Sequence, residues 1–224
     1  MQACKVRCRP KPHMRAPMPE DRTPANQSAG ALPLLDRAEV GARLRQVRKA
    51  QHMTLKQLSA LSGVPVSTLS KMELAQVSVS YEKLAAAARA LKLDIAQLFR
   101  ASGPVDTPMP ATVVVDSLPS APGYSTGTYD YHPIAGAFPE RRMTPAYARI
   151  IARERGQFDD FIRHPGQEFA LVLSGRVRIL FETGEAVSIG PQETAYFDSQ
   201  VGHIYLSESE EGGDAYVMVV MTDR

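Results

Sequence analysis

The chain has 224 residues, of which 44% are hydrophobic and 22% charged, and its formal net charge at pH 7 is +2. It has no apolar tract of the roughly 18 residues that a membrane-spanning helix needs, so we expect no membrane partner. Its two cysteines, Cys4 and Cys8, lie near the start, which excludes a disulfide framework. The basic, proline-rich start has no apolar core typical of a secretory signal, and we expect a cytoplasmic protein.

Charge is unevenly distributed along the chain. Lys and Arg outnumber Asp and Glu by six to two in residues 1–35 and by eleven to five in residues 36–101. Residues 102–224 hold nine basic against seventeen acidic side chains. This asymmetry favours a basic half that meets a polyanion and an acidic half with another task.

The pattern divides the chain into four segments. Residues 1–35 have irregular prolines and no periodicity, which predicts a disordered basic arm. Residues 36–101 show helical spacing, and residues 102–112 ("SGPVDTPMPAT") predict a linker. Residues 113–224 then predict a β domain.

Five short helices are expected within residues 36–101. Val40, Leu44 and Val47 recur with the spacing of an amphipathic helix. Thr54 is a suitable N-cap for a second helix, and Gly63 is a suitable stop. Further helices are expected after Pro65, which can open a helix, after the N-cap candidate Ser80, and over "IAQLF" at 95–99.

The period changes to two beyond the linker. The runs "YARIIA", "FALVL", "VRILF", "EAVSI", "TAYF", "HIYLS" and "YVMVVM" are β-branched or aromatic and are separated by short turn segments. No helical pattern intervenes. We therefore predict an antiparallel sandwich or barrel.

The second and third helices, joined at Gly63, describe a helix-turn-helix. The third helix is expected over "VSTLSKME" (66–73). It has few apolar residues, as expected of a helix that enters the major groove of DNA. Its outer face offers a methyl contact, hydroxyls and an ammonium group to base edges and phosphates. The predicted DNA contacts are Thr54, Val66, Ser67, Thr68, Ser70 and Lys71.

Residues 39–99 resemble the helix-turn-helix domain of phage repressors and their bacterial relatives, the XRE family. The resemblance lies in "RLRQVRKAQHMTLKQLSALSGVPVSTLSKMELAQVSVSYEKLAAAARAL". It implies a buried ion pair between Arg48 and Glu73. Leu55 departs from the family, whose members often have a polar, DNA-contacting residue there.

Residues 145–222 resemble a small cupin barrel of the double-stranded β-helix (jelly-roll) type. The matching motifs are "FIRHPGQEFALVLSGRVRIL" and "IGPQETAYFDSQVGHIYLS". In metal-binding cupins the motifs supply two histidines separated by one residue, a glutamate and a third histidine. His164, Glu168 and His203 match these positions, whereas Ile162 replaces the first histidine.

Two roles stay open for the cupin residues. Three N and O ligands can hold a divalent first-row metal ion, although the loss of one imidazole weakens such a site. Alternatively, His164, Glu168 and His203 line a pocket for a small-molecule effector. Tyr147 and Arg149 share one face of the strand "YARIIA" and are further effector-binding candidates, provided that this face points inward.

We therefore expect a two-domain protein, all-α then all-β, that acts as a DNA-binding transcriptional regulator and not as an enzyme. An effector in the cupin domain would modulate operator binding, and a homodimer would place two recognition helices on DNA. The alternative is a metal-dependent cupin oxygenase or isomerase with an accessory helix-turn-helix domain. A third interpretation is a module whose barrel only dimerises.

Overall fold

The computed structural model describes residues 34–77, 80–99, 112–138, 141–210 and 213–222. Residues Ala31–Arg224 form one compact unit. The predicted arm up to residue 33, and the predicted linker up to residue 111, lie outside the described residues. Among the helices that are described, none is long and apolar enough to cross a bilayer.

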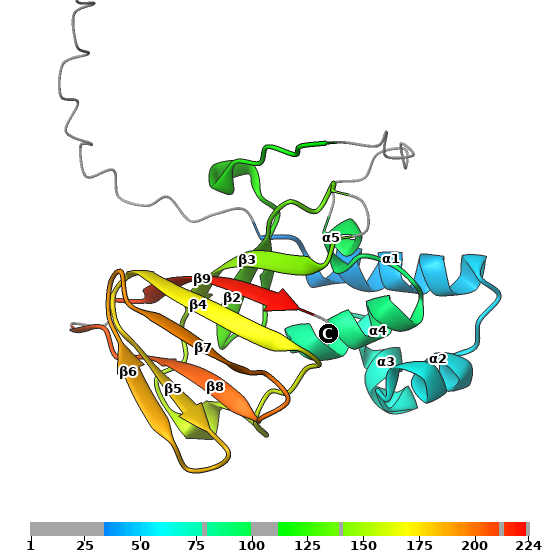
Figure 1. The fold of residues 1–224 in the computed structure, drawn as a ribbon. Coiled ribbons are helices and arrows are strands. Elements are labelled where there is room, and N and C mark those ends of the chain that lie inside the picture. The colour runs from blue at the N-terminus through cyan, green and yellow to red at the C-terminus, as the bar shows by residue number, and fades with distance from the viewer. Residues whose placement is uncertain (1–33, 78–79, 100–111, 139–140, 211–212, 223–224) are drawn as a thin grey trace, which may run out of the picture. The chain divides into compact units, whose positions relative to one another are not determined.

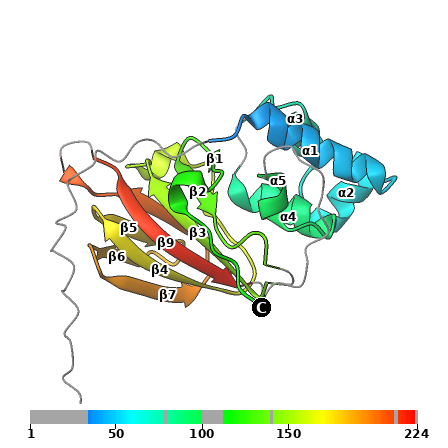
Figure 2. The same cartoon turned by 90° about the horizontal axis from the view of Figure 1, so that it is seen from above.

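The helices all precede the strands in the chain, and they gather in one group in Figures 1 and 2. They are α1 (Arg37–Ala50), α2 (Leu55–Ser62), α3 (Val66–Glu73), α4 (Tyr81–Ala90) and α5 (Ile95–Leu98). Of the five short helices that the sequence predicts, only four are full helices, because the predicted last one is a single turn of four residues, α5. The other four have at least eight residues each.

Local signals explain where α2 and α3 begin and end. The Thr54 side chain accepts a hydrogen bond from the Gln57 amide, and the Gln57 side chain accepts one from the Thr54 amide, which forms a capping box. Gly63 ends α2 with φ 72°, a left-handed conformation that glycine adopts without steric cost. Pro65 then precedes α3. Ser80 lies at the N-cap of α4, but its side chain makes no capping hydrogen bond.

The strands form two antiparallel sheets. Their bounds are β1 (Tyr124–Ser125), β2 (Tyr129–Pro133), β3 (Met143–Ile150), β4 (Gln167–Ser174), β5 (Val177–Phe181), β6 (Ala186–Ile189), β7 (Thr194–Asp198), β8 (His203–Ser207) and β9 (Ala215–Thr222). There are also two short 3-10 helices: η1 (Leu118–Ser120) precedes β1, and η2 (Arg155–Gln157) lies between β3 and β4. One sheet has the order β1-β2-β3-β9-β4-β7, and the other has the order β6-β5-β8.

The seven predicted strands correspond to β3 through β9, but the pairing takes the form of two separate sheets and not one continuous barrel sheet. The sequence did not predict β1 or β2. All five residues of β2 are buried, but its run "YDYHP" holds an aspartate and a histidine and no β-branched residue, unlike the predicted strands. Its proline is also unfavourable for a strand interior.

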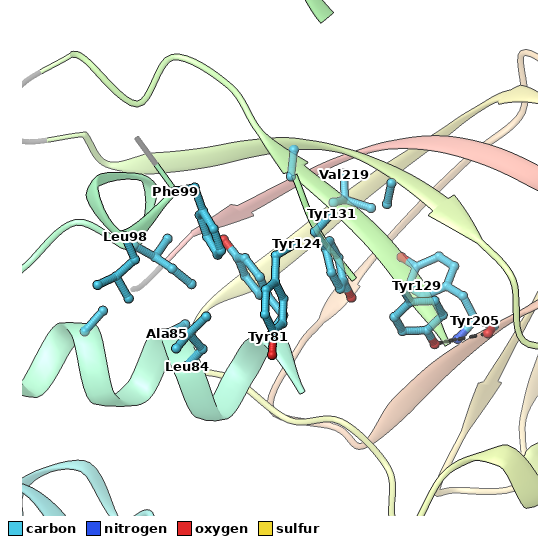
Figure 3. Packing of buried hydrophobic residues seen from close by; sticks show 14 of the residues in the cluster. Tyr81, Leu84, Ala85, Leu98, Phe99, Tyr124, Tyr129, Tyr131, Tyr205 and Val219 are labelled. Atoms are coloured by element: carbon cyan, nitrogen blue, oxygen red, sulfur yellow. Dashed lines mark hydrogen bonds between the residues drawn. The ribbon is translucent and has the colours of Figure 1, made fainter. Parts of the chain in front are cut away.

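One cluster of buried side chains includes residues of both the helices and the sheets. The rings of Tyr81 on α4 and Tyr131 on β2 have centroids 4.7 Å apart, and those of Phe99 and Tyr124 are 5.7 Å apart. Figure 3 shows these aromatic side chains with Leu84, Ala85 and Leu98 from the helices. The helical and β parts therefore share apolar packing.

An ion pair lies inside the helical part, as the family resemblance implied. Arg48 Nε lies 2.6 Å from Glu73 Oε1, and Arg48 Nη2 lies 2.8 Å from Glu73 Oε2. The same guanidinium donates to the Met53 carbonyl oxygen at 2.6 Å. Both residues are only 8% exposed. This fork-to-fork pair joins the end of α1 to the end of α3 and satisfies both buried charges.

Glu73→Gln is expected to lower the free energy of unfolding by about 3 kcal/mol, because it leaves the buried Arg48 guanidinium without its counter-charge. The matched control is Glu39→Gln, whose side chain is 53% exposed beside Arg43 and which is expected to cost less than about 1 kcal/mol. Urea unfolding followed by far-ultraviolet circular dichroism measures both. Equal costs for the two variants would contradict this account of the pair.

Candidate functional site

The outer face of α3 lies at the surface. Val66 is 42% exposed, Ser67 and Lys71 are exposed, and Thr68 and Ser70 are half-buried. Leu69 and Met72 are buried on the opposite side of the helix. Thr54 is exposed at the start of α2. None of the six residues predicted to contact DNA is buried, and their contact with DNA stays a prediction.

One edge of α3 faces the β part across an open space. Thr68 and Lys71 line a pocket of about 650 Å³, and Asp159 and Asp160 from the segment before β4 line it too. Lys71 is therefore exposed at the rim of this pocket, opposite acidic residues of the β part.

The two sheets bring together the three residues predicted from the cupin motifs. His164 lies just before β4, Glu168 lies on β4, and His203 begins β8 of the other sheet. One ligand atom from each lies within 4.8 Å of the other two. Their side chains are 9%, 4% and 3% exposed. Residues from distant parts of the chain thus form one buried His-Glu-His cluster.

The hydrogen bonds around the cluster orient both imidazoles. His203 Nδ1 lies 2.9 Å from the Val201 carbonyl oxygen, and His164 Nδ1 lies 3.3 Å from that of Pro165. A carbonyl oxygen only accepts, so each Nδ1 carries a proton. Both Nε2 atoms point at Glu168 Oε2, at 2.9 Å from His164 and 3.5 Å from His203. His164 Nε2 must therefore carry a second proton or share a cation with the carboxylate, and His203 Nε2 lies close enough to meet the same cation.

Charge and burial oppose each other at Glu168. Burial raises the pKa of its carboxyl, but the hydrogen bonds and positive charge of His164 and His203 outweigh this and lower that pKa to about 2. Burial also lowers the pKa of His164, yet its hydrogen bond to Glu168 leaves the pKa raised overall. Glu168 is thus a carboxylate at neutral pH.

Tyr205 completes the surroundings of the carboxylate. Its hydroxyl donates to Glu168 Oε1 at 2.5 Å, and its own amide donates to the Tyr129 hydroxyl oxygen at 2.7 Å. Figure 3 shows Tyr129 beside Tyr205. Tyr205 is not among the residues predicted from the cupin motifs, although it follows His203 by two residues and so lies on the same face of β8.

The cluster lines a cavity of about 20 Å³. Side chains of both sheets and one residue of α4, Glu82, form its wall. A cavity needs roughly 10–15 Å³ to hold one water molecule, so this one suits a single ion or water and not a metabolite. No signal in the sequence placed Glu82, on a helix of the other domain, at this cavity.

Ile162 also lines the cavity, where the family pattern has its first histidine. Its backbone pairs with that of His203: the Ile162 amide donates to the His203 carbonyl oxygen at 3.0 Å, and the His203 amide donates back at 2.9 Å. Because Ile162 has no ligand atom in its side chain, the cupin motifs supply only three ligands here, namely two imidazoles and the Glu168 carboxylate.

Tyr147 and Arg149 do not line this cavity. Along β3 the buried residues are Ala146, Ala148 and Ile150, and the last two face the cavity. Arg149 instead pairs with Asp130 at 3.3 Å and Asp214 at 2.5 Å, and the ring of Tyr147 stacks on that of Tyr216 at 5.7 Å. The face of β3 that carries Tyr147 and Arg149 therefore points away from the His-Glu-His cluster.

A larger pocket of about 520 Å³ adjoins the cluster. His164 and Glu82 line both spaces. Its other wall includes basic residues of α4 and the following turn, Arg89 and Lys92, and the ion pair between Arg141 and Asp94. This volume is in the range that small organic ligands occupy.

Models of two known protein families match this chain, one in the helical part and one in the β part. The helix-turn-helix family HTH_3 matches residues 44–98, and the family Cupin_2, described as a cupin domain, matches residues 152–221. No curated protein matches the sequence.

Solved structures are similar to this chain at low sequence identity. An HTH_3 family transcriptional regulator from Vibrio cholerae is 17% identical over 83% of this chain and 96% of its own, with a TM-score of 0.53. Hydroxypropylphosphonic acid epoxidase from S. wedmorenis, in complex with fosfomycin, is 17% identical over 84% of this chain and 99% of its own, with a TM-score of 0.44. The former likeness shows a common fold. The chain therefore joins an N-terminal helix-turn-helix domain of the HTH_3 (XRE) type to a C-terminal cupin domain.

Proposed function

We propose that this protein is a DNA-binding transcriptional regulator whose cupin domain controls operator binding. The observation that carries the proposal is the exposed polar face of α3 within a domain of the HTH_3 family. Hydroxyls and a lysine on this face suit base edges and phosphates. A DNA target also implies a cytoplasmic protein.

A homodimer is part of this proposal. One recognition helix covers only a few base pairs, and two of them on half-sites about one helical turn apart would give a specific operator. The basic balance of residues 36–101 supports attraction to phosphates along such a site.

We further propose that the His-Glu-His cluster holds a divalent metal ion. The donor set fits: both Nδ1 atoms donate to backbone carbonyl oxygens, as in many metal-bound histidines, and both Nε2 atoms converge on one carboxylate oxygen. A first-row ion such as Fe²⁺ or Mn²⁺ suits two imidazoles and a carboxylate. When bound, it would supply positive charge and open coordination positions.

A small effector would occupy the adjoining pocket of about 520 Å³. Three basic residues (Arg89, Lys92 and Arg141) and two acidic ones (Glu82 and Asp94) line it, which favours an effector with an anionic group. The same cluster also supports the alternative function, a metal-dependent oxygenase or isomerase, because two histidines and one carboxylate leave coordination positions for a substrate. Metal-dependent oxygen consumption with small carboxylates would favour that alternative.

Lys71→Ala is expected to weaken operator binding by about 5- to 30-fold and to reduce the slope of log affinity against log salt by about one, because one phosphate or base contact is lost. The operator is first selected from random DNA, and binding is measured by fluorescence anisotropy. Arg178→Ala on β5 removes the same charge from an exposed site in the cupin domain and should bind as the wild type does. Equal binding by all three proteins would refute the assignment of α3.

His203→Ala is expected to abolish stoichiometric metal binding, since it removes one of three ligands. The loss of metal affinity should exceed the roughly 10- to 100-fold loss that follows removal of an outer-sphere partner. Metal content is measured by mass spectrometry after loading with Mn²⁺ and dialysis. The control is His52→Asn in the exposed turn after α1, where φ is 54° and Asn is tolerated. A wild-type protein that retains no metal would refute the metal site.

A further inference from the structure

Glu82 places a carboxylate of the helix-turn-helix domain in the cavity of the cupin domain. It is the second residue of α4, directly after Tyr81, whose ring packs against Tyr131 of β2. Figure 3 shows that tyrosine pair where α4 meets the strands. Glu82 lines the cavity of about 20 Å³ together with His164, Glu168 and His203.

One oxygen of this carboxylate has no hydrogen-bond partner. Glu82 Oε2 is fully buried, and no donor among the described residues satisfies it. Burial raises the pKa of the Glu82 carboxyl overall, because it outweighs the backbone hydrogen bond, the Ser80 hydroxyl and the positive charge of His164 and His203, which lower that pKa. A buried carboxylate oxygen without a donor is unfavourable unless a cation or a proton compensates it.

The cavity has no positive side chain that could do so. Among the described residues, no lysine or arginine lines it, and its charged or titratable groups besides the tyrosines are two carboxylates and two imidazoles. The imidazole Nδ1 protons are already donated to backbone carbonyl oxygens. With neutral imidazoles the cavity would carry two negative charges, the complement of one divalent cation.

We propose that Glu82 contacts the divalent cation held by His164, Glu168 and His203, directly or through one water, and thereby couples the cavity to the helix-turn-helix domain. This inference rests on the metal site proposed above. It adds a carboxylate from outside the cupin domain. The ion would then attach α4 to the strands of both sheets, because His164 and Glu168 belong to one sheet region and His203 to the other.

The coupling would extend to the DNA-binding face through α4. This helix packs against α2, and α2 packs against α3. An ion that fixes α4 on the cupin domain therefore restricts the placement of α3. By linkage, the factor by which the ion changes DNA affinity equals the factor by which DNA changes affinity for the ion.

The test compares the wild type, Glu82→Gln and the control Glu39→Gln, all as full-length protein stripped of metal with a chelator and titrated with Mn²⁺. Free Mn²⁺ is counted by electron paramagnetic resonance. We expect Glu82→Gln to weaken Mn²⁺ binding by about 10- to 100-fold, while Glu39→Gln binds like the wild type because its side chain lies on the exposed side of α1.

Thermal unfolding gives a second readout that an ordinary packing defect would not reproduce. Without metal, Glu82→Gln should have a Tm close to that of the wild type, because the amide has nearly the same shape as the carboxylate and Glu82 Oε2 makes no hydrogen bond that the variant would lose. With saturating Mn²⁺ the wild type should have the higher Tm, since it gains more binding energy. A variant that is less stable under both conditions would assign Glu82 to packing and overturn the proposal.

DNA binding tests the coupling itself. The selected operator should bind the wild type with an affinity that Mn²⁺ changes by about fivefold or more, and this change should vanish in Glu82→Gln. Mn²⁺ binding that is equal in the wild type and Glu82→Gln would overturn the role of Glu82 and leave the metal site standing. A wild type that binds neither Mn²⁺ nor Zn²⁺ would instead overturn the metal site on which the inference rests.

Discussion

The buried carboxylate of Glu168 constrains the whole interior of the cupin domain. It lies between two imidazoles and a tyrosine hydroxyl, and its pKa is lowered to about 2 in spite of burial. Because the carboxylate stays charged and buried, a protonated His164 or a bound cation compensates it. The Nδ1 contacts to backbone carbonyl oxygens settle the orientation of both rings and leave Nε2 as the atom that meets this requirement.

The second constraint is the core that the helical and β parts share. The rings of Tyr81 and Tyr131 pack against each other across the junction with an interplanar angle of 31°, and Phe99 packs near Tyr124. Without such apolar contacts, Glu82 would be an ordinary solvated residue at the start of α4. This packing thus places Glu82 at the cavity beside His164, Glu168 and His203. It also connects the sensing part of the proposed regulator to its DNA-binding part.

Much of the fold follows from local patterns in the sequence. The capping box at Thr54 and the left-handed Gly63 are properties of neighbouring residues, and runs of β-branched or aromatic residues between turn segments identify β3 through β9. β2 was missed because its run "YDYHP" contains an aspartate, a histidine and a proline and no β-branched residue. The division into two sheets depends on pairings between distant strands, and a local pattern holds no information about these.

The site could be predicted in part, for a similar reason. His164, Glu168 and His203 were found through spacing within the cupin motifs, and the structure brings them within 4.8 Å. For Tyr147 and Arg149 alternation defined a shared face but not its direction, and the ion pairs of Arg149 with Asp130 and Asp214 keep it away from the cavity. Glu82 could not be found, because only tertiary packing brings α4 to these histidines.

The ion pair between Arg141 and Asp94 has a mechanical consequence. Arg141, which precedes β3, has a side chain only 6% exposed, and it meets Asp94 just beyond the far end of α4. Tyr81 and Glu82 anchor the opposite end. A helix held by contacts at both ends cannot pivot about one of them. A conformational change that passes from the cavity to α2 and α3 must therefore shift or rotate α4 as a whole, or must first break the contacts at one of its ends.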